Sequence, residues 1–409
     1  YAQFERPFLE QLWGKGLPFQ LICTQKIAKK LLPQVPSRNI RALLGFLGGE
    51  AFAIQRAAHH VAATEDIWRR LIPLLEAVGI LKIEDLLAWL GNPTAPAPKA
   101  KYEYRIDRLK RLELPKKPGV YRMLTSSGKI LYVGKATSLR DRVNSYFRGQ
   151  KGRDRKKLEM LSQVWDLSVT VCDSPLEAAL LEVDLIKQYD PPYNVSLKAA
   201  NRKLAYCSRD LLQENLGQTP DFPLGPFRSG GEMAALRQLW AGELRPLLYE
   251  EVEDEALVRG HGIFLANWGA HSLRSLLAKG MWRFRALRKM VEPEEESVDS
   301  EELVPEEGEE QERELPLTAE EVAERLEGVL LAAASAAVRA RELTRLLNSS
   351  VRWGRAGDEK ELRVVGGKIG GHQPAPTSLP WQSLGLEEFD RMRVLRSEIA
   401  REGGRVFHN

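Results

Sequence analysis

Cysteine is scarce in this chain of 409 residues, and the three cysteines lie far apart. Cys23, Cys172 and Cys207 show no paired spacing, so the sequence suggests neither a disulfide framework nor a zinc site. The sequence also contains no run of eighteen apolar residues and no signal-like N-terminus. These absences favour a soluble protein of a reducing cytoplasm. The first residue is Tyr1 and not methionine, so we expect the chain to be a fragment.

The overall composition is ordinary, but the charge is unevenly distributed. Hydrophobic residues make up 43% and charged residues 28%, and the length allows two to four domains. The formal net charge of +4 is an average over opposite regions, because Lys135 to Lys157 is strongly basic and Glu292 to Glu314 strongly acidic. Local charge is therefore more informative than the total.

Two short phrases predict a β-hairpin. The first is PGVY, from Pro118 to Tyr121, and the second is YVGKA, from Tyr132 to Ala136. The polar segment from Thr125 to Lys129 separates two runs that are rich in Val, Tyr, Ile and Leu. Both tyrosines are then expected on adjacent strands.

Two helices are expected after this hairpin. In the segment from Ser138 to Phe147, Ser138 can serve as the N-cap, and apolar residues recur at helical spacing. The second helix runs from about Ser174 to Tyr189 and stops before a pair of prolines. Glu182 lies on an otherwise apolar face of that helix, so its carboxylate is expected to point towards the hairpin.

In this order and at these spacings, the phrases resemble the GIY-YIG nuclease domain of the UvrC excinuclease subunit and its shorter homologues. The phrases LIKQYDPPYN, ending at Asn194, and LGPF, from Leu224 to Phe227, extend the likeness. The resemblance implies a small antiparallel sheet flanked by helices over residues 115–200. It also implies cleavage of phosphodiester bonds in DNA.

Phosphodiester cleavage needs a water nucleophile, a divalent metal and a cation near the non-bridging oxygens. By resemblance, Glu182 is the metal ligand, and its hard oxygens suit Mg²⁺, with Mn²⁺ as an alternative. Arg142 matches the catalytic arginine of the family, which would hold the scissile phosphate. Arg140 is the neighbour most easily mistaken for it.

Tyr121 and Tyr132 are both candidate general bases, and the sequence does not decide between them. A phenol with a pKa of about 10 needs an adjacent cation to act as a base at neutral pH, and Lys135 is placed to provide one. We further expect DNA contacts from Arg140, Tyr146, Lys156 and Asn194. Taken singly, each of these residues also has a structural interpretation, such as a packed tyrosine, a solvated glutamate or a basic helix face.

Residues 1–90 resemble the later motifs of the DEDDh proofreading exonucleases, which include the epsilon subunit of DNA polymerase III. Where that family has aspartates, this chain has Glu5 after Phe4 and Glu65 in the HxAxxD motif that starts at His60. An added methylene displaces each carboxylate, and a two-metal site with ions about 4 Å apart tolerates this badly. We therefore expect a ribonuclease H-like remnant with a degenerate site. The alternative for His60 and Glu65 is the polar side of a helix whose core face is Ile67, Leu71 and Leu74.

The other segments are less specific. Residues 91–114 are expected to be a linker, residues 201–290 an extension like that of UvrC homologues with a basic helix, and residues 291–316 an acidic disordered linker. Residues 317–409 are expected to be mainly helical and truncated, with Thr318 and Glu321 forming a capping box at the first helix. The fold class is thus a multidomain chain of α/β and α+β type.

Together these features predict a metal-dependent DNA endonuclease that makes a single-strand incision in a process like nucleotide excision repair. Such a protein would be cytoplasmic and associated with the bacterial nucleoid. The sequence leaves open whether a damage-recognition protein loads it onto DNA. The alternative is a non-catalytic DNA-binding accessory whose degenerate nuclease domains only dock the substrate.

Overall fold

A computed structural model describes most of the chain. The described residues are 2–13, 16–50, 54, 56–92, 102–148, 154–194, 203–249, 251–269, 272–290, 316–353, 360–366, 368–369, 385–402 and 405–408. They divide into two compact units, Tyr1–Val195 and Ser196–Asn409, and each is described by itself. Among the described helices, none combines the length and the apolar character that a membrane crossing requires.

The first unit begins with helices only. Over residues 2–92 the described elements are α1 (Ala2–Trp13), α2 (Thr24–Leu31), α3 (Ile40–Phe46), α4 (Ala57–Ala77) and α5 (Ile83–Gly91). Ile27, Leu43, Ile67 and Leu71 form the centre of a core to which α2, α3, α4 and α5 contribute. Leu75 completes the buried stripe of α4, while Leu74 is partly buried beside it. The described residues of this region contain no β-strand, so the ribonuclease H-like remnant predicted from the sequence is not shown.

A three-stranded antiparallel sheet follows, in the order β2-β1-β3. Its strands are β1 (Gly119–Leu124), β2 (Ile130–Ala136) and β3 (Asp166–Val171). The predicted hairpin is confirmed, and its register pairs Tyr121 with Gly134 and Met123 with Tyr132. Because side chains alternate along a strand, Tyr121, Met123, Tyr132 and Gly134 share one face.

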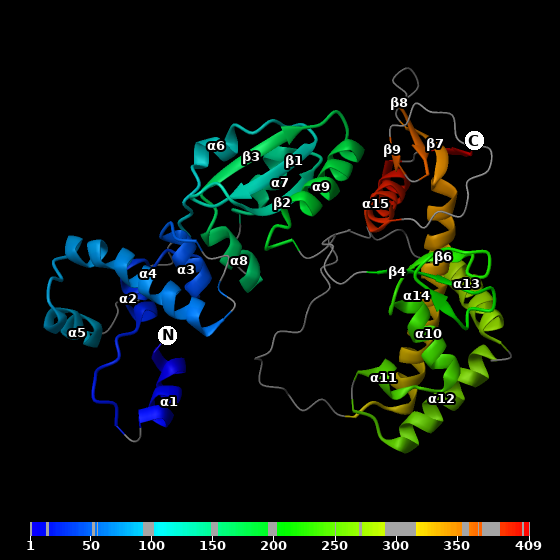
Figure 1. The fold of residues 1–409 in the computed structure, drawn as a ribbon, viewed down its shortest axis with the longest axis horizontal. Helices are drawn as coiled ribbons and strands as arrows, with labels where there is room; N and C mark the ends of the chain where they lie inside the picture. The colour runs from blue at the N-terminus through cyan, green and yellow to red at the C-terminus, as the bar shows by residue number, and fades with distance from the viewer. Residues whose placement is uncertain are drawn as a thin grey trace. The chain divides into compact units, whose positions relative to one another are not determined.

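Four helices surround this sheet, namely α6 (Arg108–Leu112), α7 (Leu139–Ser145), α8 (Arg155–Ser162) and α9 (Pro175–Tyr189). Both α7 and α9 pack on β1 and β2 (Figure 1). The predicted start of α9 is confirmed, since the Ser174 hydroxyl accepts a hydrogen bond of 3.1 Å from the Glu177 N–H. Ser138 is the N-cap residue of α7, but its hydroxyl donates to Asp141 Oδ2 at 2.6 Å and caps no backbone group.

The N-terminal helices and the sheet belong to the same compact unit. The segment expected to link them is only partly described, and its described part does not behave as a linker. Ile106 is 3% exposed and belongs to the core of the sheet region, while Arg111 stacks on the Phe147 ring at 4.0 Å. The described part of this segment therefore packs against the apolar surface that the sheet and α7 form.

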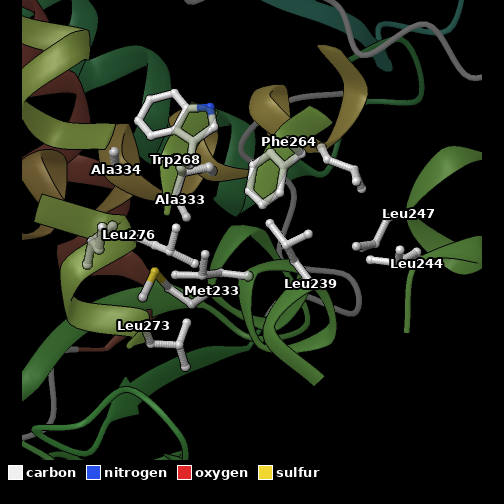
Figure 2. Packing of buried hydrophobic residues seen from close by; sticks show 14 of the residues in the cluster. Met233, Leu239, Leu244, Leu247, Phe264, Trp268, Leu273, Leu276, Ala333 and Ala334 are labelled. Atoms are coloured by element: carbon white, nitrogen blue, oxygen red, sulfur yellow. The ribbon is translucent and has the colours of Figure 1, made fainter. Parts of the chain in front are cut away.

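The second unit is built on one long helix, α14 (Ala319–Leu346). Helices α10 (Glu232–Ala241), α11 (Arg245–Leu248), α12 (Asp254–Trp268) and α13 (Leu273–Met290) pack on it, together with a sheet of order β5-β4-β6 made of β4 (Leu204–Cys207), β5 (Glu214–Asn215) and β6 (Leu224–Arg228). Figure 2 shows the core, where Met233, Phe264 and Trp268 lie close to Ala333 and Ala334 of α14. Small residues on α14 allow this close approach.

The C-terminal region contains a second sheet, of order β10-β7-β8-β9. Its elements are β7 (Asn348–Trp353), β8 (Lys360–Val365), β9 (Lys368–Ile369), α15 (Leu386–Glu402) and β10 (Arg405–His408). The predicted capping box is confirmed, because Thr318 and Glu321 each bond the backbone N–H of the other. The predicted acidic linker lies outside the described residues, except for its last residue.

Candidate active site

The outer edge of β2 carries the Glu182 carboxylate. Strand β2 pairs with β1 on one side only, so the backbone groups on its other side need different partners. The Lys135 N–H finds one in Glu182 Oε1, at 2.8 Å. The inward direction predicted for Glu182 therefore holds, and a backbone group of the strand fixes the carboxylate.

The residues after α9 occupy the rest of this edge. The Tyr193 N–H donates to the Leu131 carbonyl at 3.2 Å. The Asn194 side chain accepts from the Val133 N–H at 2.9 Å and donates to the Val133 carbonyl at 2.8 Å. Asn194 is 7% exposed, so both ends of its amide are used within the fold. This geometry favours a structural role for Asn194 over the DNA contact expected from the sequence.

Three tyrosines form a cluster on the face of the sheet next to α7. The Tyr121 and Tyr146 hydroxyls lie 2.8 Å apart and share a hydrogen bond. The ring centroid of Tyr132 lies 6.1 Å from that of Tyr121 and 6.3 Å from that of Tyr146. Tyr146, for which the sequence suggested DNA contact, is therefore a member of the same cluster as both candidate bases.

Gly134 makes room for this cluster. A Cβ atom at Gly134 would lie 2.4 Å from the Tyr121 hydroxyl oxygen and 2.8 Å from Cε1 of Tyr132. Both distances are far below van der Waals contact, and the crowded atoms belong to buried or half-buried rings that cannot swing away. The glycine of the YVGKA phrase is thus required by the packing of the tyrosines.

The two arginines of α7 have different surroundings. Arg142 is exposed, and its guanidinium lies 5.5 Å from the centroid of the Tyr146 ring. Arg140 is half-buried near the start of the helix, and its backbone carbonyl accepts a hydrogen bond of 2.8 Å from Asn144. Of the two, Arg142 is the one that the described contacts place beside the tyrosines.

Burial distinguishes the two candidate bases. Tyr121 is fully buried, and this desolvation raises its pKa well above the ordinary value of 10.0; the neighbouring Tyr132 and Tyr146 raise it further, and Arg142 opposes them. An ionised phenolate is therefore disfavoured at Tyr121. Tyr132 is only half-buried, so it is the better placed of the two to exchange a proton with water.

The oxygen donors at this edge fit a magnesium ion that keeps most of its waters. A carboxylate has about four acceptor sites, and the Lys135 N–H uses one of those at Glu182. Among the described residues, no cluster of three or more His, Cys, Asp and Glu side chains is arranged to hold a metal. Mg²⁺ needs no such cluster, since one or two carboxylates and several waters are its usual shell.

Other residues predicted from the sequence lie outside this assembly. Lys156 is exposed near the start of α8. Glu65 is exposed on α4 and forms an ion pair of 2.6 Å with Arg69, while His60 is exposed one turn earlier. Glu5 is exposed on α1. Glu5, His60 and Glu65 therefore belong to no metal-binding cluster of three or more such side chains among the described residues.

The spacing of Tyr146 from Arg142 could have placed Tyr146 in the site, although matching the family motifs does not use this spacing. Tyr146 follows Arg142 by four residues, so the two share one side of the turn that ends α7. No comparable signal marks the backbone of Lys135, because which strand edge lies open depends on the order of strands in the finished sheet.

Comparisons with known proteins identify one domain within this chain. The family model for the UvrC-like GIY-YIG domain matches residues 117–195. A Mycobacterium tuberculosis protein named as a candidate bifunctional exonuclease/endonuclease is 31% identical over 228 residues in the N-terminal half, covering 54% of this chain and 34% of that protein. UvrABC system protein C of a Thermoanaerobacter species is 53% identical over 85 residues, covering 21% of this chain and 14% of that protein.

A solved structure is also similar to part of this chain. It is the GIY-YIG N-terminal endonuclease domain of UvrC from Thermotoga maritima, bound to magnesium as its catalytic divalent cation. That domain is 36% identical, and the match covers 22% of this chain and 94% of that one, with a TM-score of 0.20. The chain thus spans 34% of the length of the Mycobacterium relative and 14% of the length of the Thermoanaerobacter relative.

The buried hydroxyl of Tyr121 makes a prediction about alkaline stability. Its pKa is raised in the folded state, so the folded protein retains a proton that the unfolded chain releases above about pH 10, and the free energy of unfolding falls as the pH rises beyond that value. We expect Tyr121→Phe to reduce this fall. The measurement is denaturant unfolding followed by circular dichroism at neutral and alkaline pH. Tyr189→Phe, at a tyrosine that is 48% exposed, should keep the wild-type pH dependence; the same behaviour in Tyr121→Phe would contradict the prediction.

Proposed function

Because residues 117–195 form a UvrC-like GIY-YIG domain, we propose that this protein is a metal-dependent endonuclease that makes a single-strand incision in DNA. The observation that supports this most is the assembly of an anchored carboxylate, a tyrosine cluster and an exposed arginine around one strand. An incision in a repair process of the excision type is the finer form of the proposal. This finer form is supported by the sequence similarity to UvrABC system protein C.

Each residue has a distinct task in this proposal. Glu182 would hold a Mg²⁺ ion, which would supply positive charge to neutralise the phosphate. Arg142 would donate hydrogen bonds to the non-bridging oxygens as negative charge develops on them. Tyr132 would accept the proton of the attacking water in its phenolate form, which the positive charge of the metal ion and of Lys135 would favour. Tyr121 and Tyr146, joined by their hydroxyls, would hold the Tyr132 ring in place.

The competing function is a DNA-binding accessory without catalysis. A carboxylate held in position by the Lys135 N–H is an arrangement that DNA docking alone does not need, because a carboxylate repels phosphate. The decisive experiment incubates the full chain with end-labelled damaged and undamaged duplexes in the presence of Mg²⁺. Binding without any cleavage would favour the accessory role.

The first prediction from this proposal separates the metal-binding role of Glu182 from its contribution to the stability of the fold. Glu182→Gln keeps an oxygen that can accept the Lys135 N–H but weakens the metal ligand, so we expect cleavage to be lost while the melting temperature and DNA affinity stay close to wild type. Glu182→Ala should lose cleavage and some stability as well. Gel cleavage assays, thermal unfolding and binding in Ca²⁺ measure these outcomes. Normal turnover by Glu182→Gln would overturn the metal assignment.

The second prediction compares the two arginines of α7. Arg142→Ala should lower the single-turnover cleavage rate about 10²-fold or more, because it removes a charge-assisted contact to the transition state. Arg140→Ala removes the same charge from the same helix and serves as the matched control, with an expected loss of less than about fivefold. Equal losses in the two variants would show that the arginine was assigned to the wrong position.

The third prediction concerns the N-terminal helices. We expect no 3′-5′ exonuclease activity, because Glu65 is engaged by Arg69 on the surface of α4 and both motif aspartates are glutamates. The assay follows a 5′-labelled single strand incubated with the Glu182→Ala variant, in which the other site is silent. Progressive shortening from the 3′ end that stops in a further His60→Ala, Glu65→Ala variant would refute the degenerate site.

A further inference from the structure

The seam between the N-terminal helices and the sheet region is closely packed. A Cβ atom at Gly45 of α3 would lie 2.3 Å from Cγ of Gln163, just after α8. The Trp165 indole donates to the Gly45 carbonyl at 2.8 Å. Arg105 stacks on Phe46 at 4.2 Å and bonds the carbonyl of the same residue at 3.0 Å. The helices therefore sit against the sheet region through specific polar contacts as well as apolar packing.

Glu159 of α8 is the residue at which this seam meets the end of the nuclease domain. Its Oε2 accepts a hydrogen bond of 2.5 Å from Asn39, the N-cap residue of α3. Its Oε1 accepts one of 2.6 Å from the Tyr193 hydroxyl. Each oxygen of a single carboxylate thus takes a donor from a different part of the unit. The Tyr193 hydroxyl also accepts a hydrogen bond from Gln163.

Tyr193 is a dependable donor in this arrangement. Burial, with Glu159 beside it, raises the pKa of Tyr193 above its ordinary value, so the hydroxyl keeps its proton throughout the physiological range. A short hydrogen bond from a neutral phenol to a carboxylate is among the stronger kinds in proteins. The ring of Tyr193 is therefore held at a defined position.

The position of Tyr193 determines how the chain meets β2. Its backbone N–H bonds Leu131, and the next residue, Asn194, bonds both backbone groups of Val133. Tyr132 lies between these two anchored residues of the strand. A continuous set of contacts therefore runs from Asn39 through Glu159 and Tyr193 to the backbone on both sides of Tyr132.

We propose that Glu159 is a positioning residue of the nuclease site, which couples the N-terminal helices to strand β2 through Asn39 on one side and Tyr193 on the other. The inference rests on the nuclease function proposed above and assigns the N-terminal helices a task that needs no exonuclease chemistry. They hold the edge of β2, and with it Tyr132 and the N–H that anchors Glu182, in the geometry required for cleavage.

Two substitutions break the coupling with little change in shape. Tyr193→Phe removes the hydroxyl and keeps the ring and the backbone bond to Leu131. Asn39→Ser keeps a residue that can cap α3 but is too short to reach Glu159. Each should lower the single-turnover cleavage rate about tenfold, because small displacements of reacting groups cost rate steeply, while DNA affinity measured in Ca²⁺ is unchanged. The double variant should lose no more than the worse single variant, since both act through one carboxylate.

Ser162→Ala is the matched control. Ser162 lies on the same helix as Glu159 and accepts a hydrogen bond of 3.1 Å from the Ser37 N–H across the same seam, but it has no described contact with Tyr193. It should lower the melting temperature by a similar amount and leave the cleavage rate within about twofold of wild type. Rate losses that simply follow melting temperature across all four variants would overturn the proposal, as would unchanged rates in Tyr193→Phe and Asn39→Ser.

Hydrogen–deuterium exchange gives a readout that does not depend on cleavage. The Val133 and Lys135 N–H groups should exchange about tenfold faster in Tyr193→Phe than in Ser162→Ala, because only the former loosens the edge of β2. If wild type cleaves no DNA, the proposed function fails, and exchange still tests the coupling. If wild type cleaves and exchange at β2 is the same in every variant, the coupling alone is refuted.

Discussion

The open edge of strand β2 is the constraint on which the candidate site depends. A strand that pairs on one side only leaves N–H and C=O groups that need partners, and here a glutamate, an asparagine and a backbone amide supply them. The residue that would bind metal is therefore also a structural partner of the sheet. The hydrogen bond that satisfies the strand edge therefore also positions Glu182 in the candidate site.

The tyrosine cluster shows how one fold gives similar side chains different roles. Tyr121 points into the space left by Gly134 and loses all contact with water, so its hydroxyl stays protonated and serves as a hydrogen-bond partner. Tyr132, two pairs along the hairpin and on the edge strand, keeps partial access to solvent. Strand order separates the two phenols, one as scaffold and one as the candidate base.

Much of this could be predicted from local patterns. The hairpin, helix α9 with its Ser174 cap and the capping box at Thr318 each depend on residues that are close together in the sequence. The role of Asn194 could not be predicted, because its partner lies 61 positions earlier on an edge that exists only in the folded sheet. The packing of Ile106 and Arg111 was missed for the same reason, since their neighbours come from α7 and beyond. Contacts between distant segments are set by topology, which a motif does not encode.

The long helix α14 has a consequence for how the second unit is made. Its buried face closes the core formed by α10, α12 and α13, and Thr344 near its end bonds the Gly225 carbonyl at 3.0 Å. During synthesis those three helices leave the ribosome well before α14, so they emerge with apolar surfaces that have no partner yet. The Trp268 and Phe264 side chains therefore remain exposed to water until Ala333 and Ala334 of α14 pack against them. Chain termination after α13 and before α14 would accordingly leave a product with exposed apolar surface that is prone to aggregate.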